Sequence, residues 1–270
     1  MNKHYKLLAV LSTAAAMSAA TPALALSIPG SVSTVLAATA GWLNEDGELR
    51  YKDSEGYYLT DSWKKKDGEW YYLNEDGFIS RSSKIDEYYV NEEGRRVMNQ
   101  WVSEANEDEW DSEAPDTYWY YYGKDGRSVI SKWQEIDGKN YYFNDEGVMM
   151  TGWVAVKSNA KTGDTSGISK FVYLGGADEG IMAKNKWLEL SEHPGDSDDK
   201  DEISADSNSD EVPDEGESNW YYFDSDGTAA YLNSKAANMS KATTKIDGSS
   251  YFFNAYGVRQ TGLIHIVTSS

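Results

Sequence analysis

The sequence predicts an all-β fold, a solenoid of stacked β-hairpin repeats of about 20 residues each, and three observations lead to this prediction. A pattern of Trp, Asp-Gly and paired Tyr recurs along most of the chain. The chain contains 20 Tyr and 10 Trp but only 6 Phe, so most of its aromatic rings carry a polar atom that suits a half-exposed position. The segments inside the repeats vary in length while the pattern persists, as expected when insertions fall at hairpin tips.

One repeat is clearest between Trp133 and Trp153, which are 20 residues apart. A short strand begins at Trp133, and Asp137-Gly138 follows, a pair that accepts the positive φ angles of a two-residue hairpin turn. The aromatic run at residues 140–143 predicts the second strand, and residues 144–147 (NDEG) end it and turn the chain. Because a single hairpin is barely stable in water, neighbouring repeats are expected to stack.

Residues 41–263 are predicted to hold eight such repeats. Their aromatic pairs, or the remnants of them, lie near Tyr51, Tyr71, Tyr88, Tyr120, Tyr141, Val172, Tyr221 and Tyr251. Three repeats have longer hairpin tips, near residues 103–117, 157–169 and 191–218, where extra residues cost least. The third tip contains twelve acidic residues in a spacing that does not fit an EF-hand. It is predicted to be a solvated loop that packs against nothing.

The two ends of the chain are predicted to lie outside the repeats. Residues 1–40 resemble a secretory leader, because Lys3 and Lys6 precede an apolar, Ala-rich run and small residues follow it. Cleavage after Ala25 and cleavage after Ala40 both fit. No later apolar run approaches the roughly 20 residues that span a bilayer. Residues 264–270 are a terminal tail, and the chain is expected to be secreted.

Composition excludes several classes of function. The chain has no Cys, and its three His lie in the leader, in the acidic tip and in the tail, so a thiol nucleophile, a histidine triad and a zinc site are not expected. A net charge of −20 disfavours nucleic acid as a partner. Paired carboxylates recur at the turns, where turn geometry explains them. No enzymatic activity, cofactor or metal is therefore predicted.

Residues 147–153 (GVMMTGW), together with residues 70–73 (WYYL) and 220–223 (WYYF), resemble the cell-wall-binding (choline-binding) repeat family, which is related to glucan-binding repeats. The resemblance covers about residues 41–263. It implies a secreted, cell-wall-associated protein of the Gram-positive type whose hairpins hold choline groups of teichoic acids. Glucan binding by aromatic stacking and a structural or adhesive role stay open as alternatives, as does a homodimer joined through the terminal hairpins.

The resemblance also implies where a ligand binds. A quaternary ammonium has no hydrogen-bond donor, so aromatic faces hold it best. A cage of this family takes a Trp from the first strand, the Trp of the second strand and an aromatic residue of the next hairpin. Trp101, Trp119 and Trp133 match all three positions. The incomplete candidates are Trp63 with Trp70, where the next Trp position holds Ser83, Trp187 with Trp220, and Trp153, and packing alone would also explain each of these rings.

Overall fold

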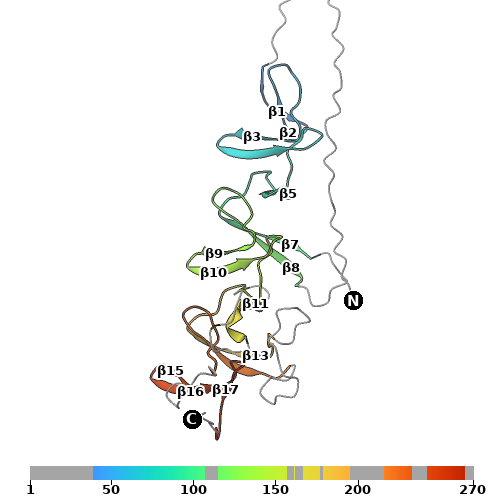
Figure 1. Ribbon diagram of the computed structural model, residues 1–270. Helices are drawn as coiled ribbons and strands as arrows, with labels where there is room; N and C mark the ends of the chain where they lie inside the picture. Colours follow the sequence, from blue (N-terminus) through green and yellow to red (C-terminus); the bar gives the residue numbers. More distant parts are fainter. Residues whose placement is uncertain are drawn as a thin grey trace, which may run out of the picture.

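The computed structural model describes residues 39–106, 115–156, 161, 167–176, 179–194, 216–232 and 242–264. Within them, antiparallel hairpins follow one another along a long axis (Figure 1), so the predicted solenoid of stacked hairpins is confirmed. Residues 1–38 of the predicted leader and the tail beyond residue 264 lie outside the described residues.

Each hairpin pairs a first strand with a second strand. The first strands are β1 (Gly41–Glu45), β3 (Ser62–Lys66), β5 (Ser83–Ile85), β7 (Gln100–Ala105), β9 (Lys132–Ile136), β11 (Trp153–Ala155), β13 (Lys186–Leu190) and β15 (Thr243–Ile246). The second strands are β2 (Glu48–Lys52), β4 (Glu69–Leu73), β6 (Tyr88–Val90), β8 (Thr117–Tyr122), β10 (Lys139–Phe143), β12 (Phe171–Tyr173), β14 (Asn219–Phe223) and β16 (Ser249–Phe253). The short helix η1 (Ile168–Lys170) precedes β12, and β17 (Arg259–Gln260) adds a third strand to the last hairpin.

Asp-Gly pairs close the tight hairpins, as the sequence predicts. Between β9 and β10, Asp137 has a φ of 51° and Gly138 a φ of 76°. Two consecutive positive φ angles match the right-handed twist of the flanking strands, which is why this dipeptide is favoured there. The turn fixes a register in which Trp133 stands opposite Tyr142.

A second turn connects each hairpin to the next. In the β9–β10 repeat, Asn144 Oδ1 accepts hydrogen bonds from the backbone N–H groups of Glu146 at 3.1 Å and Val148 at 2.8 Å. The chain then runs back beside the hairpin, so that Phe143 pairs with Met149 in an isolated bridge. This return segment contacts the preceding hairpin, because the Met149 N–H donates to the Trp119 carbonyl oxygen at 2.8 Å.

We expect Gly94→Ala to destabilise the fold more than Gly138→Ala. Their φ angles are 77° and 76°, so each substitution carries a similar conformational cost of about 1 kcal/mol. A Cβ on Gly94 would lie 2.9 Å from both the Ser80 carbonyl oxygen and Ile79 Cδ1, whereas nothing lies within 4 Å of one on Gly138. The clash should add about 1–3 kcal/mol, measured by urea unfolding followed through Trp fluorescence. Equal losses in the two variants would contradict this close contact between repeats.

The core is a series of aromatic contacts between consecutive hairpins. In each contact, the Trp of a first strand packs against the first Tyr of the following hairpin's aromatic run, with ring centroids 4.9–5.6 Å apart. The pairs are Trp42–Tyr71, Trp63–Tyr88, Trp101–Tyr141, Trp153–Tyr221 and Trp187–Tyr251. Each hairpin thus completes its neighbour's hydrophobic cluster, which explains why the repeats depend on stacking.

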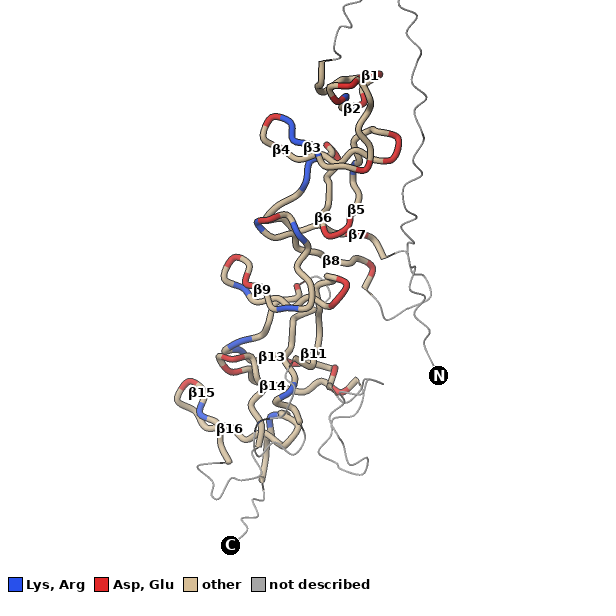
Figure 2. Tube along the Cα trace, turned by 45° about the horizontal axis from the view of Figure 1, so that its top comes forward, with Lys and Arg blue, Asp and Glu red and all other residues tan. Residues whose placement is uncertain are grey.

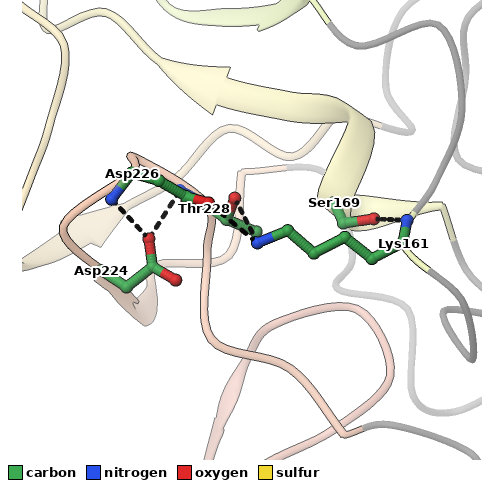
Figure 3. A network of polar contacts seen from close by, with 5 residues as sticks. All are labelled: Lys161, Ser169, Asp224, Asp226 and Thr228. Carbon is green, nitrogen blue, oxygen red and sulfur yellow. Dashed lines mark hydrogen bonds and ion pairs between the residues drawn. The ribbon is translucent and has the colours of Figure 1, made fainter.

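The longer tip between β11 and β12 contacts a later hairpin through Lys161 (Figure 3). Lys161 Nζ donates to Asp226 Oδ2 at 3.1 Å and to Thr228 Oγ1 at 3.0 Å. The hydrogen bond shared with Asp224, followed by those from Thr228 and Lys161, lowers the pKa of Asp226, while burial raises the pKa of Asp224. Asp226 is therefore ionised at neutral pH and attracts Lys161.

The start of the acidic tip near 191–218 is packed, which corrects the expectation that this loop contacts nothing. His193 is only 4% exposed, and its ring lies 6.1 Å from the ring of Tyr256. The indole N–H of Trp153 donates to the Glu192 carbonyl oxygen at 3.0 Å. The charge count of the segment does not predict this contact, because it reflects the acidic residues and not the single imidazole that packs near an aromatic ring. Residues 195–215, which hold most of the acidic residues of this tip, lie outside the described residues.

Acidic residues gather at the turns of successive hairpins (Figure 2), and those of the Asp-Gly turns, such as Asp67 and Asp137, are exposed. No helix in the described part of the chain is long and apolar enough to cross a membrane.

Candidate functional site

Trp101 and Trp119 form two walls of an aromatic cage on the β7–β8 hairpin. In the strand register Ser103 stands opposite Trp119, which makes the two Trp diagonal neighbours on one face of the hairpin. Their ring centroids are 6.5 Å apart and their planes are inclined by 81°. Tyr141 of the next hairpin is the third wall, with its ring centroid 4.9 Å from that of Trp101. Burial, and to a smaller extent Asp137, raises the pKa of Tyr141, so its ring is a neutral phenol.

Met149 is the floor residue of this cage by its position, and its side chain is packed between the aromatic cluster and Gly180. Its backbone N–H donates to the Trp119 carbonyl oxygen at 2.8 Å, and its side chain is 7% exposed. The thioether belongs to the cluster against which Trp101 and Trp119 pack. Among the described residues, no Lys or Arg lies over the rings of this cage. The cage therefore presents aromatic faces and an apolar floor, a combination that attracts a cation without hydrogen-bond donors.

Trp133 occupies a different place from the one that the sequence comparison suggested. It stands opposite Tyr142 across its own hairpin, with ring centroids 5.2 Å apart, and is 36% exposed. No ring contact in the described part of the chain joins it to Trp101 or Trp119. Successive residues of a strand face opposite sides. Trp133 lies on the same face of its hairpin as Tyr142, whereas Tyr141 lies on the opposite face and contacts the preceding hairpin.

A second cage is formed by Trp63, Trp70 and Tyr88. Trp63 and Trp70 lie on β3 and β4, and the Tyr88 ring of the next hairpin lies 5.4 Å from that of Trp63. The Arg96 guanidinium lies among the three rings. Its Cζ is 5.1 Å from the ring centroid of Tyr88, 5.7 Å from that of Trp70 and 5.9 Å from that of Trp63.

A third cage lies at the C-terminal end, where Trp187 of β13 and Trp220 of β14 join Tyr251 of the last hairpin. The ring centroids of Trp187 and Tyr251 are 4.9 Å apart. Arg259 Cζ lies 5.4 Å from the Trp220 ring and 5.8 Å from the Trp187 ring. The residues paired in the sequence, Trp63 with Trp70 and Trp187 with Trp220, are therefore brought together.

Trp153 is enclosed by packing. Its ring centroid lies 5.5 Å from that of Tyr173, 5.3 Å from that of Tyr221 and 5.4 Å from that of Phe223. In its hairpin, the buried Phe171 stands where three other hairpins have Trp70, Trp119 or Trp220 on the second strand. Trp153 thus contributes to the core between two hairpins.

The β5–β6 repeat replaces its Trp residues with charged ones. Lys84, rather than the expected Ser83, stands opposite Tyr89, in the position that Trp63 takes opposite Tyr72. Glu87 precedes the aromatic pair where Trp70 would lie, and a groove of about 640 Å³ opens beside Lys84, Glu87 and Tyr120. The Lys84 ammonium, 5.3 Å from the Tyr120 ring, takes part in a polar site unlike the three cages.

Sequence reasoning missed the third wall and the floor of each cage. The walls Tyr88, Tyr141 and Tyr251 share one signal, because each is the first Tyr, or only Tyr, of the aromatic run one repeat after a Trp pair. The floor residues lie two places after a turn glycine, as Arg96 follows Gly94.

Comparisons with known proteins match parts of the chain to two families of repeats. A family model described as a choline-binding repeat matches residues 129–163, and one described as a putative cell wall binding repeat matches residues 61–77 and 215–229. No curated protein matches the chain.

Solved structures that match the chain include the modular autolysin LytC from Streptococcus pneumoniae, which is 24% identical over 83% of this chain and 38% of its own, with a TM-score of 0.49. The choline-binding domain of CbpL from the same organism is 23% identical over 76% of this chain and 100% of its own, with a TM-score of 0.35. The choline binding domain of Spr1274, also from S. pneumoniae, is 32% identical over 23% of this chain and 88% of its own, with a TM-score of 0.21. This chain spans little more than a third of the LytC chain. The chain therefore carries a segment that matches a choline-binding repeat, at residues 129–163, and two that match a putative cell wall binding repeat, at residues 61–77 and 215–229.

Proposed function

We propose that the chain is a secreted, non-catalytic module that attaches to the Gram-positive cell wall by binding choline groups of teichoic acids. The observation that carries this proposal is the cage of Trp101, Trp119 and Tyr141 above Met149. The trimethylammonium group of choline offers charge and methyl groups but no N–H donor. Three ring faces and a thioether floor match that chemistry without any buried carboxylate.

The distribution of carboxylates supports a module without catalysis. Asp145 and Glu146 are exposed at the turn that follows β10, and the Asn144 side chain and the turn geometry account for their position. Comparable acidic residues recur at the turns of other hairpins. A glycosidase needs two carboxyl groups that face each other across a cleft, one of them with a raised pKa. Periodic, solvated turn residues do not provide that arrangement.

Binding strength would depend on the polymer rather than on a single choline. Three cation–π contacts of about 0.5–2 kcal/mol each give a dissociation constant in roughly the millimolar range. A teichoic acid displays many copies of its substituents, so a cage that releases one choline group can bind another nearby, and free choline at high concentration competes with all of them.

Retention of the full chain on a tertiary-amine matrix tests the proposal. Because the chain has a net charge of −20, it would bind any cationic matrix by ion exchange, so loading is done in about 1 M NaCl, where the Debye length is about 3 Å. We expect retention that free choline reverses and an equal addition of NaCl does not. A parallel column of insoluble α-glucan distinguishes the alternatives. Retention there that is indifferent to choline would support glucan binding, and failure on both matrices would support an adhesive role.

A further inference from the structure

The three cages share one backbone framework but differ in their floor residue. The floor residue is the one that pairs with the last residue of the second strand in the hairpin that follows the two Trp. The floor residues are Arg96, which pairs with Val90, Met149, which pairs with Phe143, and Arg259, which pairs with Phe253. Each lies six residues after its partner. The N–H of Arg96 donates to the Trp70 carbonyl oxygen at 2.9 Å, as that of Met149 does to Trp119 at 2.8 Å. The side chains of Arg96 and Met149 therefore start from equivalent points below equivalent walls.

Arg96 has the surroundings of a bound cation rather than of a surface arginine. Its guanidinium lies within 6 Å of three ring centroids, and its Nε is buried without a hydrogen-bond partner. In the described part of the chain Arg96 forms no ion pair, although Arg50, Arg81 and Arg127 each pair with a Glu. The chain has 45 acidic residues that could pair with an arginine. The Arg96 side chain contacts aromatic rings instead, and a guanidinium stacks well on such rings.

Arg259 repeats this arrangement in the third cage. Its Cζ lies within 6 Å of the Trp187 and Trp220 ring centroids, and its Nε is likewise buried without a hydrogen-bond partner. It too forms no ion pair with any described carboxylate. The two arginines lie in hairpins far apart in the sequence, so each arises from its own repeat.

We infer that Arg96 and Arg259 are internal occupants that close two of the three aromatic cages, so that only the cage of Trp101, Trp119 and Tyr141 is open to an external cation. The identity of the external cation as choline rests on the proposed function. A guanidinium held on its own side chain is present at high effective concentration, so a ligand of millimolar affinity must displace it. The apparent affinity of a closed cage equals its intrinsic affinity multiplied by the fraction of molecules in which the arginine has left the cage.

Indole N–H signals of the full, ¹⁵N-labelled chain test this inference when choline chloride is titrated against NaCl of equal ionic strength. In the wild type, the signals of Trp101 and Trp119 should shift, and those of Trp63 and Trp70 should not. Arg96→Met gives the second cage the floor that Met149 gives the first. We then expect Trp63 and Trp70 to respond in the same concentration range, which doubles the number of responding Trp pairs.

Three further variants complete the test. Arg259→Met should open the third cage, made by Trp187 and Trp220, in the same way. Met149→Arg should close the first cage and abolish the response of its two Trp. Arg95→Met is the matched control, because it removes the same charge one residue away from Arg96. The Arg95 side chain is exposed and hydrogen-bonds to Tyr71. It should leave Trp63 and Trp70 silent.

The outcomes separate this inference from the proposed function. A response of Trp63 and Trp70 in the wild type equal to that of Trp101, or silence of a folded Arg96→Met variant, would overturn the closed cages. Silence of Trp101 and Trp119 in the wild type would instead refute choline binding. In that case the Arg96 Nε–H signal decides, because ring currents should displace it upfield in the wild type and Trp70→Ala should abolish the displacement. An ordinary chemical shift in the wild type would overturn the inference.

Discussion

Replacing Trp119 with Ala is expected to abolish choline-dependent retention of the chain. The substitution removes one of the three walls of the cage, a contact worth about 0.5–2 kcal/mol, and so weakens the cage up to about thirtyfold. For a site of roughly millimolar affinity, that loss leaves no binding at practical choline concentrations. The measurement is elution from the tertiary-amine matrix by choline in about 1 M NaCl.

Two further variants show whether the effect belongs to the cage. Trp119→Phe keeps an aromatic face and should retain part of the affinity. Tyr57→Ala removes a ring that is 63% exposed and lies outside all three cages, so its elution should match that of the wild type. If Trp119→Ala eluted like the wild type, Trp119 would not contribute to the binding site.

Phe143→Ala should cause the largest loss of stability. The Phe143 side chain is fully buried, lies 5.8 Å from the Trp101 ring and belongs to a cluster with Val129, Ile136 and Tyr141. Removing a buried phenyl ring costs about 3–5 kcal/mol, a large share of the stability of an ordinary domain. We expect the urea midpoint, followed by Trp fluorescence, to fall sharply.

A nearby exposed residue is the reference for that measurement. Ile130 follows the buried Val129 but is 51% exposed, so Ile130→Ala should change the free energy of unfolding by no more than about 0.5 kcal/mol. Comparable effects of the two substitutions would show that the cluster around Phe143 does not hold the centre of the stack together. Since Phe143 supports Trp101, its loss should also weaken the choline response.

The fold follows from the sequence because its signals are local. The Asp137-Gly138 pair selects a two-residue turn, and the Asn144 side chain closes the next turn through hydrogen bonds to residues two and four places on. Those interactions depend on neighbours in the chain, so their periodic recurrence is enough to predict the stack. The tip lengths do not disturb this periodicity.

The composition of the cages depends on how one hairpin sits on the next, and a repeat pattern does not contain that information. Trp133 matches the spacing of a third wall, yet the register of β10 turns Tyr141 toward Trp101 instead. The frame also slips by one residue at Lys84, because Trp63 and Lys84 are 21 residues apart whereas Trp133 and Trp153 are 20 apart.

Charge counts likewise conceal how individual cations are used. Arg96 and Arg259 contribute two positive charges to a strongly acidic chain, and nothing in the composition separates them from Arg81 or Arg127, which pair with carboxylates. Their position two residues after a turn glycine marks them only once the return segment is known to lie beneath the preceding hairpin.

The step from one hairpin to the next is set by the Trp–Tyr contacts and the return turn, and not by the length of the tips. Trp101 reaches Tyr141 from a repeat with an enlarged tip much as Trp63 reaches Tyr88 from a tight one. The spacing of the hairpins along the axis therefore does not change when residues are added at a tip. A foreign peptide grafted between β7 and β8 would be held at a defined position along the axis, and the hairpins on either side would keep their places.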